Sequence, residues 1–157
     1  MRLALYQPDI PQNLGTLLRL AACLSVGVDI IEPCGFPLDD KRIKRAGMDY
    51  LADLEFLRHK SWNEFLSVKS GRVILMTTKS STSLLHFEFR ANDILLLGRE
   101  SAGVPEIVHE ECEGRLLIPM AKGKRSLNVA TAGAIALGEG LRQTNGYPRL
   151  NEFEEEI

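Results

Sequence analysis

The sequence predicts an α/β domain in which helices cover both faces of a parallel β-sheet. Five short runs are apolar at nearly every position, which is typical of parallel strands buried on both faces. Segments with helical spacing separate these runs, so strands and helices alternate along the chain. The length of 157 residues, with 45% hydrophobic and 25% charged residues, fits one domain with a substantial core. We therefore predict a single domain over residues 1–157.

The predicted elements follow one another in a regular order. Strands are expected at residues 3–6, 28–31, 73–76, 94–97 and 116–118, and helices at 14–24, 40–46, 62–68, 105–109 and 129–142. Pro8 ends the first strand and Pro119 the last, because proline has no N–H to donate to a sheet. The turn-forming residues 145–148 end the last helix, and we expect the acidic segment 144–157 to be a mobile tail.

The last predicted helix is unusual in its glycine content. Ser126 precedes it and is a good N-cap residue, so it marks the expected helix start. Gly133, Gly138 and Gly140 each cost roughly 1 kcal/mol relative to alanine inside a helix. We expect another backbone to pass close to this helix and to require small residues there.

Neither a membrane protein nor a metal protein is indicated. No apolar run reaches the roughly 18 residues that suggest a membrane span. The N-terminus lacks the pattern of a signal peptide, so we expect a cytoplasmic protein. The chain has no CxxC pair and no metal-ligand spacing among its histidines, so we expect no metal. The residues concerned are Cys23, Cys34, Cys112, His59, His86 and His109.

The net charge of −2 argues weakly against a nucleic-acid partner, but the acidic residues are unevenly placed. Four glutamates lie in residues 151–157, and without them the chain is net positive. Two basic groups are candidates for phosphate binding. The first consists of Lys41, Arg42, Lys44 and Arg45, for which a solvated helix face is the alternative, and the second of Lys122, Lys124 and Arg125.

Three polar segments are expected at the carboxyl ends of strands, where ligands bind in sheets of this kind. In the first, Asn13 can cap a helix, and Arg19 follows Gly15 by one helical turn. The alternative for this segment is an ordinary cap followed by a surface arginine.

The other two segments each combine a special backbone feature with polar side chains. Glu100 lies between Gly98 and Gly103, which favours a loop that brings backbone amides and a carboxylate to a ligand. This loop matches neither G-x-G-x-x-G nor G-x-S-x-G, so the dinucleotide and hydrolase fingerprints are absent. Ser126 and Asn128 lie at a helix N-terminus, whose free N–H groups suit a ribose, phosphate or carboxylate.

Together the three segments resemble the motifs of the SPOUT RNA ribose methyltransferases. The matching patterns are Asn13-x-Gly15-x-x-x-Arg19, Leu97-Gly98-x-Glu100-x-x-Gly103-x-Pro105, and Ile118-Pro119-Met120 followed by Arg125-Ser126-Leu127-Asn128. They span almost the whole chain, from residue 3 to residue 143. The short length and the segments IIEPCGF and DDKRIKRAGMDY resemble the minimal branch of the family, which methylates the wobble ribose of tRNA.

The resemblance implies a C-terminal deep trefoil knot, S-adenosylmethionine as cofactor, a homodimer and a tRNA substrate. The implied reaction is 2′-O-methylation of the wobble cytidine or modified uridine, in leucine tRNAs. Two alternatives stay open: methylation of another tRNA or rRNA ribose, and a non-catalytic RNA-binding protein of the same fold.

The resemblance also assigns roles to residues. Arg19 is implied as the catalytic arginine, with Asn13, Glu100 and Asn128 fixing the loops and the ribose. The residues implied in cofactor binding are Met76, Gly98, Ile118, Ser126 and Leu127. The two basic groups are expected to bind RNA. The chain departs from its relatives at Ala130, Thr131 and Gly138.

Overall fold

The structure is a computed structural model, and it describes residues 1–39 and 54–149. Its strands form one six-stranded sheet in the order β3-β2-β1-β5-β4-β6, and all pairs of neighbours are parallel. The strands are β1 (Arg2–Tyr6), β2 (Gly27–Ile31), β3 (Phe56–His59), β4 (Val73–Met76), β5 (Ile94–Leu97) and β6 (Gly114–Leu116). The helices are α1 (Pro11–Cys23), α3 (Trp62–Val68), α4 (Glu106–Glu111) and α5 (Val129–Thr144), with a 3₁₀ turn, η2, at Leu84–His86.

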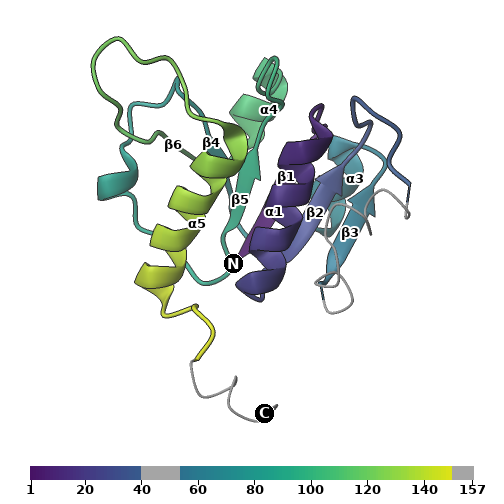
Figure 1. Cartoon of the computed structure of the whole chain (residues 1–157), viewed down its shortest axis with the longest axis horizontal. Helices are drawn as coiled ribbons and strands as arrows, with labels where there is room; N and C mark the ends of the chain where they lie inside the picture. The colour runs from purple at the N-terminus through teal and green to yellow at the C-terminus, as the bar shows by residue number, and fades with distance from the viewer. Residues whose placement is uncertain (40–53, 150–157) are drawn as a thin grey trace.

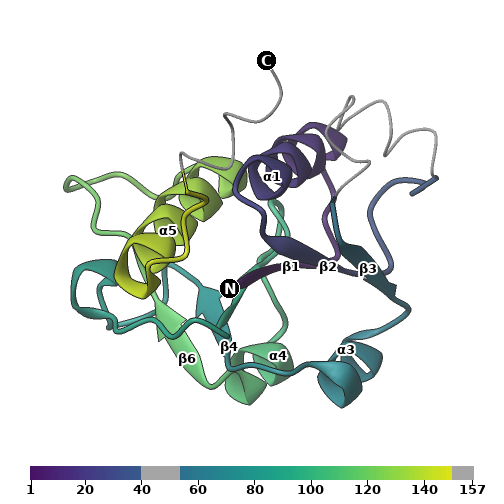
Figure 2. The same ribbon diagram turned by 90° about the horizontal axis from the view of Figure 1, so that it is seen from below.

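Helices cover both faces of the sheet, as the sequence predicts. Helices α1 and α5 lie side by side over one face, and α3 and α4 lie over the other (Figures 1 and 2). Strand β1 shows why both faces are apolar. Leu3 and Leu5 belong to the core beneath α1 and α5, whereas Ala4 and Tyr6 belong to the core on the opposite face.

The direction in which strands are added to the sheet reverses between β1 and β5. From β1 the chain adds β2 and β3 on one side, and it then places β5, β4 and β6 on the other side. In open α/β sheets a crevice forms at such a switch point, beyond the carboxyl ends of the strands. Helices α1 and α5 both begin at this end of the sheet, at the top of Figure 1.

Most predicted strands are confirmed, with two differences. β6 ends at Leu116, so the prediction of 116–118 was displaced towards the C-terminus. Leu117 instead forms an isolated bridge with Ser83 of the loop that follows β4. Strand β3 was missed, because its sequence FLRH mixes apolar and basic residues and its middle two residues are exposed at the sheet edge. The predicted helix at 40–46 lies outside the described residues.

Two predicted helix caps were wrong. Helix α1 begins at Pro11, and its N-cap residue, Ile10, makes no side-chain hydrogen bond, so Asn13 lies inside the first turn. Asn128, not Ser126, caps α5: its Oδ1 accepts from the N–H groups of Ala130 at 2.9 Å and Thr131 at 3.2 Å.

The glycines of α5 are explained by side chains rather than by a crossing backbone. A Cβ at Gly133 would lie 2.8 Å from Leu97 Cδ1 and 3.0 Å from Leu17 Cδ2. A Cβ at Gly140 would meet Met1 Sδ at 2.5 Å. These contacts let α5 pack directly on β5 and α1, so the expectation of a close backbone neighbour at these two positions was wrong.

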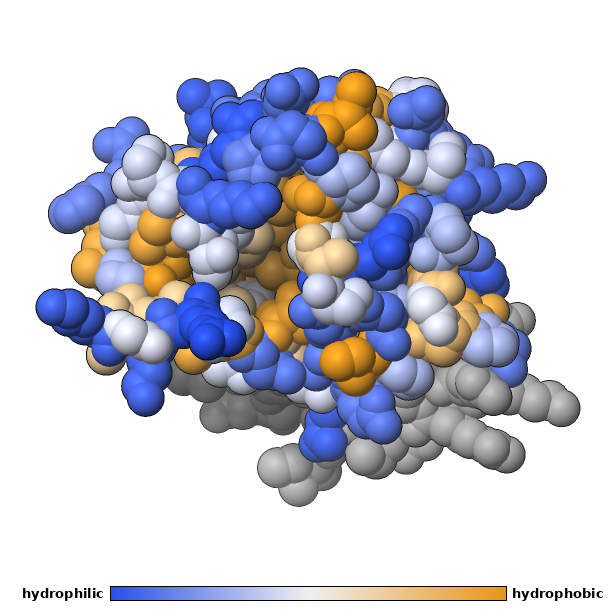
Figure 3. Space-filling model, turned by 90° about the horizontal axis from the view of Figure 1, so that it is seen from above, coloured by the Kyte–Doolittle hydropathy of each residue, from blue (hydrophilic) through white to orange (hydrophobic). Residues whose placement is uncertain are grey.

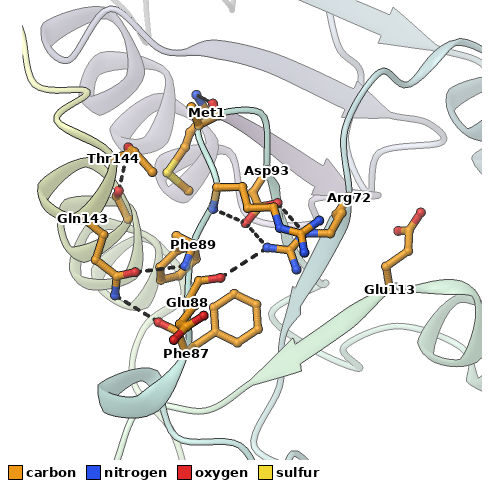
Figure 4. A network of polar contacts seen from close by, with 12 residues as sticks. Met1, Arg72, Phe87, Glu88, Phe89, Asp93, Glu113, Gln143 and Thr144 are labelled. Carbon is orange, nitrogen blue, oxygen red and sulfur yellow. Dashed lines mark hydrogen bonds and ion pairs between the residues drawn. The ribbon is translucent and has the colours of Figure 1, made fainter.

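The opposite end of the sheet is held by a polar network (Figure 4). Asp93 is fully buried, and its two carboxylate oxygens each accept from the Arg72 guanidinium at 2.8 Å. The Gln143 side chain ties the end of α5 to the segment before β5: its Nε2 donates to Phe87 O at 3.0 Å, and its Oε1 accepts from Phe89 N at 2.9 Å. The C-terminal end of α5 is therefore anchored, which helps to fix where the helix begins.

Candidate active site

A cavity of about 530 Å³ lies beyond the carboxyl ends of β4, β5 and β6. Figure 3 looks onto this end of the molecule and shows an apolar recess surrounded by hydrophilic side chains. Segments after all three strands contribute to its wall, together with the first turns of α1 and α5 and a residue of α4. The volume is in the range of small-molecule and cofactor sites.

Three residues from distant parts of the sequence form a hydrogen-bonded chain in the wall. Asn13 Nδ2 donates to Glu100 Oε1 at 3.0 Å, and Asn128 Nδ2 donates to Asn13 Oδ1 at 2.9 Å. Asn13 is buried, although it lies on the first turn of a helix. Because Asn13 donates to one partner and accepts from the other, it links the loop after β5 to the N-terminus of α5.

Glu100 also faces a second carboxylate, that of Asp9. Asp9 N donates to Glu100 Oε2 at 3.1 Å, and Glu100 N donates to Asp9 Oδ1 at 3.1 Å. Burial, followed by the contact with Asp9, raises the pKa of Glu100. The contact with Glu100, aided by hydrogen bonds from Ser101, lowers the pKa of Asp9 to about 2. Within the pair, charge on Asp9 is therefore favoured over charge on Glu100.

The glycines around Glu100 shape its loop. Arg99 and Gly103 pair through two backbone hydrogen bonds of 3.1 and 2.9 Å, which close the loop on itself. A Cβ at Gly98 would lie 2.9 Å from both Cα and C of Gly103, so only glycine fits there. Gly103 has φ +66°, the left-handed region that favours glycine. The two glycines therefore determine the shape of the loop, and their role in bringing backbone amides to a ligand stays a prediction.

The structure brings together most of the residues selected from sequence. The cavity lining includes Met76, Gly98, Ile118, Ser126 and Leu127, and also Asn13, Glu100 and Asn128. Arg19 is exposed on α1 and is not among the lining residues. Lys122, Lys124 and Arg125 are exposed on the loop that precedes α5, outside the cavity lining. The other basic group, Lys41, Arg42, Lys44 and Arg45, lies outside the described residues.

Several lining residues were not selected from the sequence. Thr77, Thr78 and Lys79 line the cavity directly after β4, and their place behind a buried strand was an available signal. Arg99 carries the same signal, because it follows the buried strand β5, whereas His109 carries none, because its position depends on how helix α4 folds back. His109 Nδ1 accepts from Arg115 Nε at 3.1 Å, which places the ring proton on Nε2. In the described part of the chain, that Nε2 is buried and has no hydrogen-bond partner.

The described ranges contain neither a metal cluster nor a membrane-spanning helix. No group of three or more His, Cys, Asp and Glu side chains is arranged there to hold a metal ion. No helix among these residues is long and apolar enough to cross a lipid bilayer.

The fold and the three loops around the cavity are those of an RNA methylase family. The chain belongs to the SpoU rRNA Methylase family, whose model matches residues 1–138. The SPOUT resemblance of the motifs is thereby confirmed.

Within this family, the chain is similar in sequence to enzymes that act on tRNA. The chain is 53% identical over 151 residues to the tRNA (cytidine(34)-2'-O)-methyltransferase of Beijerinckia indica, with 94% of each chain covered. It is 35% identical over 151 residues to the enzyme of the same name from Escherichia coli K12, with 94% of this chain and 96% of that enzyme covered.

Solved structures of RNA methyltransferases have the same fold as this chain. One, described as "Structural insights into the 2-OH methylation of C/U34 on tRNA", has a TM-score of 0.84 and 41% identity, and covers 90% of this chain and 94% of that one. The SpoU methyltransferase AviRb from Streptomyces viridochromogenes, in complex with AdoMet, has a TM-score of 0.80 and 25% identity. That match covers 91% of this chain and 60% of AviRb.

Proposed function

We propose that this protein is an S-adenosylmethionine-dependent methyltransferase that modifies the 2′-oxygen of the wobble nucleotide, cytidine or modified uridine, in tRNA. The observation that carries the proposal is the cavity whose wall joins Asn13, Glu100 and Asn128. The curated relatives are named as tRNA cytidine-34 methyltransferases, and the chain matches them over almost their full length. This match supports the tRNA assignment. Leucine tRNAs are the substrates that the sequence resemblance implies.

The cavity fits S-adenosylmethionine in size and chemistry. Its volume accommodates a nucleoside with an amino-acid side arm. Apolar residues such as Leu75, Leu97 and Val104 suit a base, and the buried Nε2–H of His109 is a donor that lacks an acceptor. An unpaired buried donor costs about 1–3 kcal/mol, so a ligand acceptor at this point would stabilise the site. When bound, the cofactor supplies a methyl group on a positively charged sulfur.

The chain's own residues would position the reaction rather than perform covalent chemistry. Asn13 and Asn128 hold the loop of Glu100 against α5, which fixes the wall of the cavity. Alignment of the 2′-oxygen with the methyl group can supply much of the acceleration. A guanidinium stays protonated in proteins and is therefore a poor general base, so the proposed role of Arg19 is to hold the phosphate and ribose of the target.

The RNA substrate is tested by comparing RNA from cells with and without the gene. Loss of the 2′-O-methyl mark at the tRNA wobble position, with all other ribose marks retained, is the expected result. An unchanged wobble position would contradict the tRNA assignment and favour another tRNA or rRNA ribose, an alternative that the description of the family as rRNA methylases keeps open. Failure of the folded protein to bind S-adenosylmethionine in calorimetry would favour the non-catalytic RNA-binding alternative.

We further propose a cytoplasmic homodimer with a C-terminal trefoil knot. The exposed position of Arg19 on α1, away from the cavity of its own chain, supports a site completed by a second copy. Co-expression of Arg19→Ala with Gly98→Val tests this, because each variant is expected to be inactive alone. In an equal mixture about half of the dimers would be mixed, and each mixed dimer would contain one intact site of two. The mixture should therefore recover about a quarter of wild-type activity. No restored activity in a mixed dimer shown to form would contradict a shared site.

A further inference from the structure

Arg99 is a half-buried cation in the cavity wall that the resemblance to the methyltransferase motifs does not assign. It stands between Gly98 and Glu100, and it lines the cavity. Among the described residues, no carboxylate forms an ion pair with its guanidinium; its contacts are the amide oxygen of Gln7 and the ring of Tyr6, whose centroid lies 6.0 Å from Arg99 Cζ. A half-buried charge without a counter-ion is costly, which suggests that its partner arrives with a ligand.

Two carboxylates, that of the adjacent residue Glu100 and that of its contact Asp9, are already engaged elsewhere. Glu100 accepts from Asn13 Nδ2 and from Asp9 N. Asp9 accepts from Glu100 N and from the Ser101 hydroxyl. The two acidic side chains are therefore turned towards each other and towards α1, and they do not serve as counter-ions for Arg99.

Gln7 holds the guanidinium in one orientation. Its Oε1 accepts from Arg99 Nη2, and its Nε2 donates to Glu32 O at 3.5 Å. Its backbone N–H continues the pairing with β2 through Ile31 O at 2.8 Å, yet its φ of +46° is unusual for a residue other than glycine. Such a backbone persists only where the surroundings hold it in place, and here it points the amide at Arg99.

The backbone of Arg99 is fixed as well, because it pairs with Gly103 in both directions. A guanidinium has five N–H donors in a planar fork, and Gln7 uses one of them. The remaining donors match the geometry of an oxyanion, which they can bind through two parallel hydrogen bonds.

We propose that Arg99 binds an oxyanion of a ligand in this cavity. The proposal rests on the proposed function, which offers two oxyanions: the phosphodiester that flanks the target ribose, and the carboxylate of the cofactor's amino-acid arm. The chemistry recognised is the same in both cases, and the binding experiment below separates the two sources.

The test compares Arg99→Gln with Arg90→Gln, which removes the same charge from an exposed residue at the opposite end of the sheet, where its backbone N–H donates to Asp93. Three probes are used: unmodified substrate tRNA, S-adenosylhomocysteine, and 5′-methylthioadenosine, which lacks the carboxylate. If the anion is a phosphodiester, Arg99→Gln weakens tRNA binding by about tenfold and lowers the salt slope by about 0.7–0.9, while both nucleosides bind normally. If the anion is the carboxylate, Arg99→Gln binds S-adenosylhomocysteine about tenfold more weakly than the unaltered protein does, whereas its affinity for 5′-methylthioadenosine is unchanged.

Two results would overturn the proposal. The first is binding by Arg99→Gln that equals that of Arg90→Gln for all three probes. The second is an equal loss for 5′-methylthioadenosine, which would mean a damaged cavity rather than a lost ion contact. Arg99→Lys keeps the charge but not the fork, so it should recover only part of the affinity. Binding of S-adenosylhomocysteine by the unaltered protein tests the proposed function separately from Arg99.

Discussion

Gly133 determines how closely three elements of the site can approach one another, which makes Gly133→Ala an informative perturbation. A Cβ there would lie 2.8 Å from Leu97 Cδ1, which is closer than real Cβ contacts, and 3.0 Å from Leu17 Cδ2, which is tighter than most of them. Overpacking of this kind costs about 1–3 kcal/mol, and the higher helix propensity of alanine returns about 1 kcal/mol. We expect a net loss of about 0–2 kcal/mol in the free energy of unfolding, together with weaker binding of S-adenosylhomocysteine.

Gly138→Ala is the matched control, because it makes the same change in the same helix. Among the described residues, and apart from the backbone of the helix itself and the two chain neighbours, the only heavy atom within 4 Å of a Cβ at Gly138 is the hydroxyl of Tyr147, at 3.0 Å, which lies at the movable end of a side chain. The propensity gain is common to both variants, so the difference between their unfolding free energies isolates the overpacking term. We expect Gly133→Ala to be less stable than Gly138→Ala by about 1–3 kcal/mol in urea unfolding. Equal stabilities, or equal affinities for S-adenosylhomocysteine, would refute the role assigned to Gly133.

Three further predictions concern the caps, the carboxylate pair and the distant network. Asn128→Ala should lower the free energy of unfolding by about 2–4 kcal/mol, because it removes the α5 cap and leaves the buried Asn13 amide oxygen without its donor. Ser126→Ala should change the free energy of urea unfolding by no more than about 0.5 kcal/mol. Similar losses in the two variants would contradict the cap assignment. Because the pKa of Glu100 is raised on folding, its contribution to stability is fully present below its unfolded pKa and is lost as the pH rises through its folded pKa. Glu100→Gln should therefore flatten this part of the plot of unfolding free energy against pH. Parallel plots for the variant and the unaltered protein would show that another group is responsible. Asp93→Ala should cost about 1–3 kcal/mol, because it removes the acceptor of the Arg72 guanidinium and of the Arg90 N–H. The folded variant should bind S-adenosylhomocysteine as tightly as the unaltered protein, and weaker binding would mean that the two ends of the sheet are coupled.

The periodicity of apolar residues predicted the parallel sheet because each central strand is buried on both faces. Strand β3 escaped this pattern, since an edge strand can expose Leu57 and Arg58 and still pair with β2 through its backbone. The end of β6 was misplaced for a related reason. Leu117 and Ile118 are as apolar as Leu116, and only the bridge from Leu117 to the loop after β4 shows where the ladder stops.

The residues of the site were easier to predict than their roles. Asn13 and Ser126 both have N-cap propensity, and both were expected to cap helices. Local propensity cannot reveal that Asn13 has partners 87 and 115 residues away, which satisfy its side chain better than its own helix end does. The capping role at α5 belongs to Asn128, which also supplies the bond to Asn13. Arg99 was passed over because nothing in its sequence neighbourhood shows that its charge lacks a carboxylate partner.

The geometry of the site depends on the packing directly beneath it. Gly133 lies five residues beyond Asn128 on α5, Leu17 lies four residues beyond Asn13 on α1, and Leu97 ends the strand that leads to Glu100. The contact of Gly133 with Leu17 and Leu97 therefore sets the separation of the three elements that carry Asn13, Asn128 and Glu100. Hydrogen bonds of 2.9 and 3.0 Å tolerate little change in that separation. A slim helix is thus required one turn below the cavity, and this requirement explains a glycine that helix propensity alone would reject.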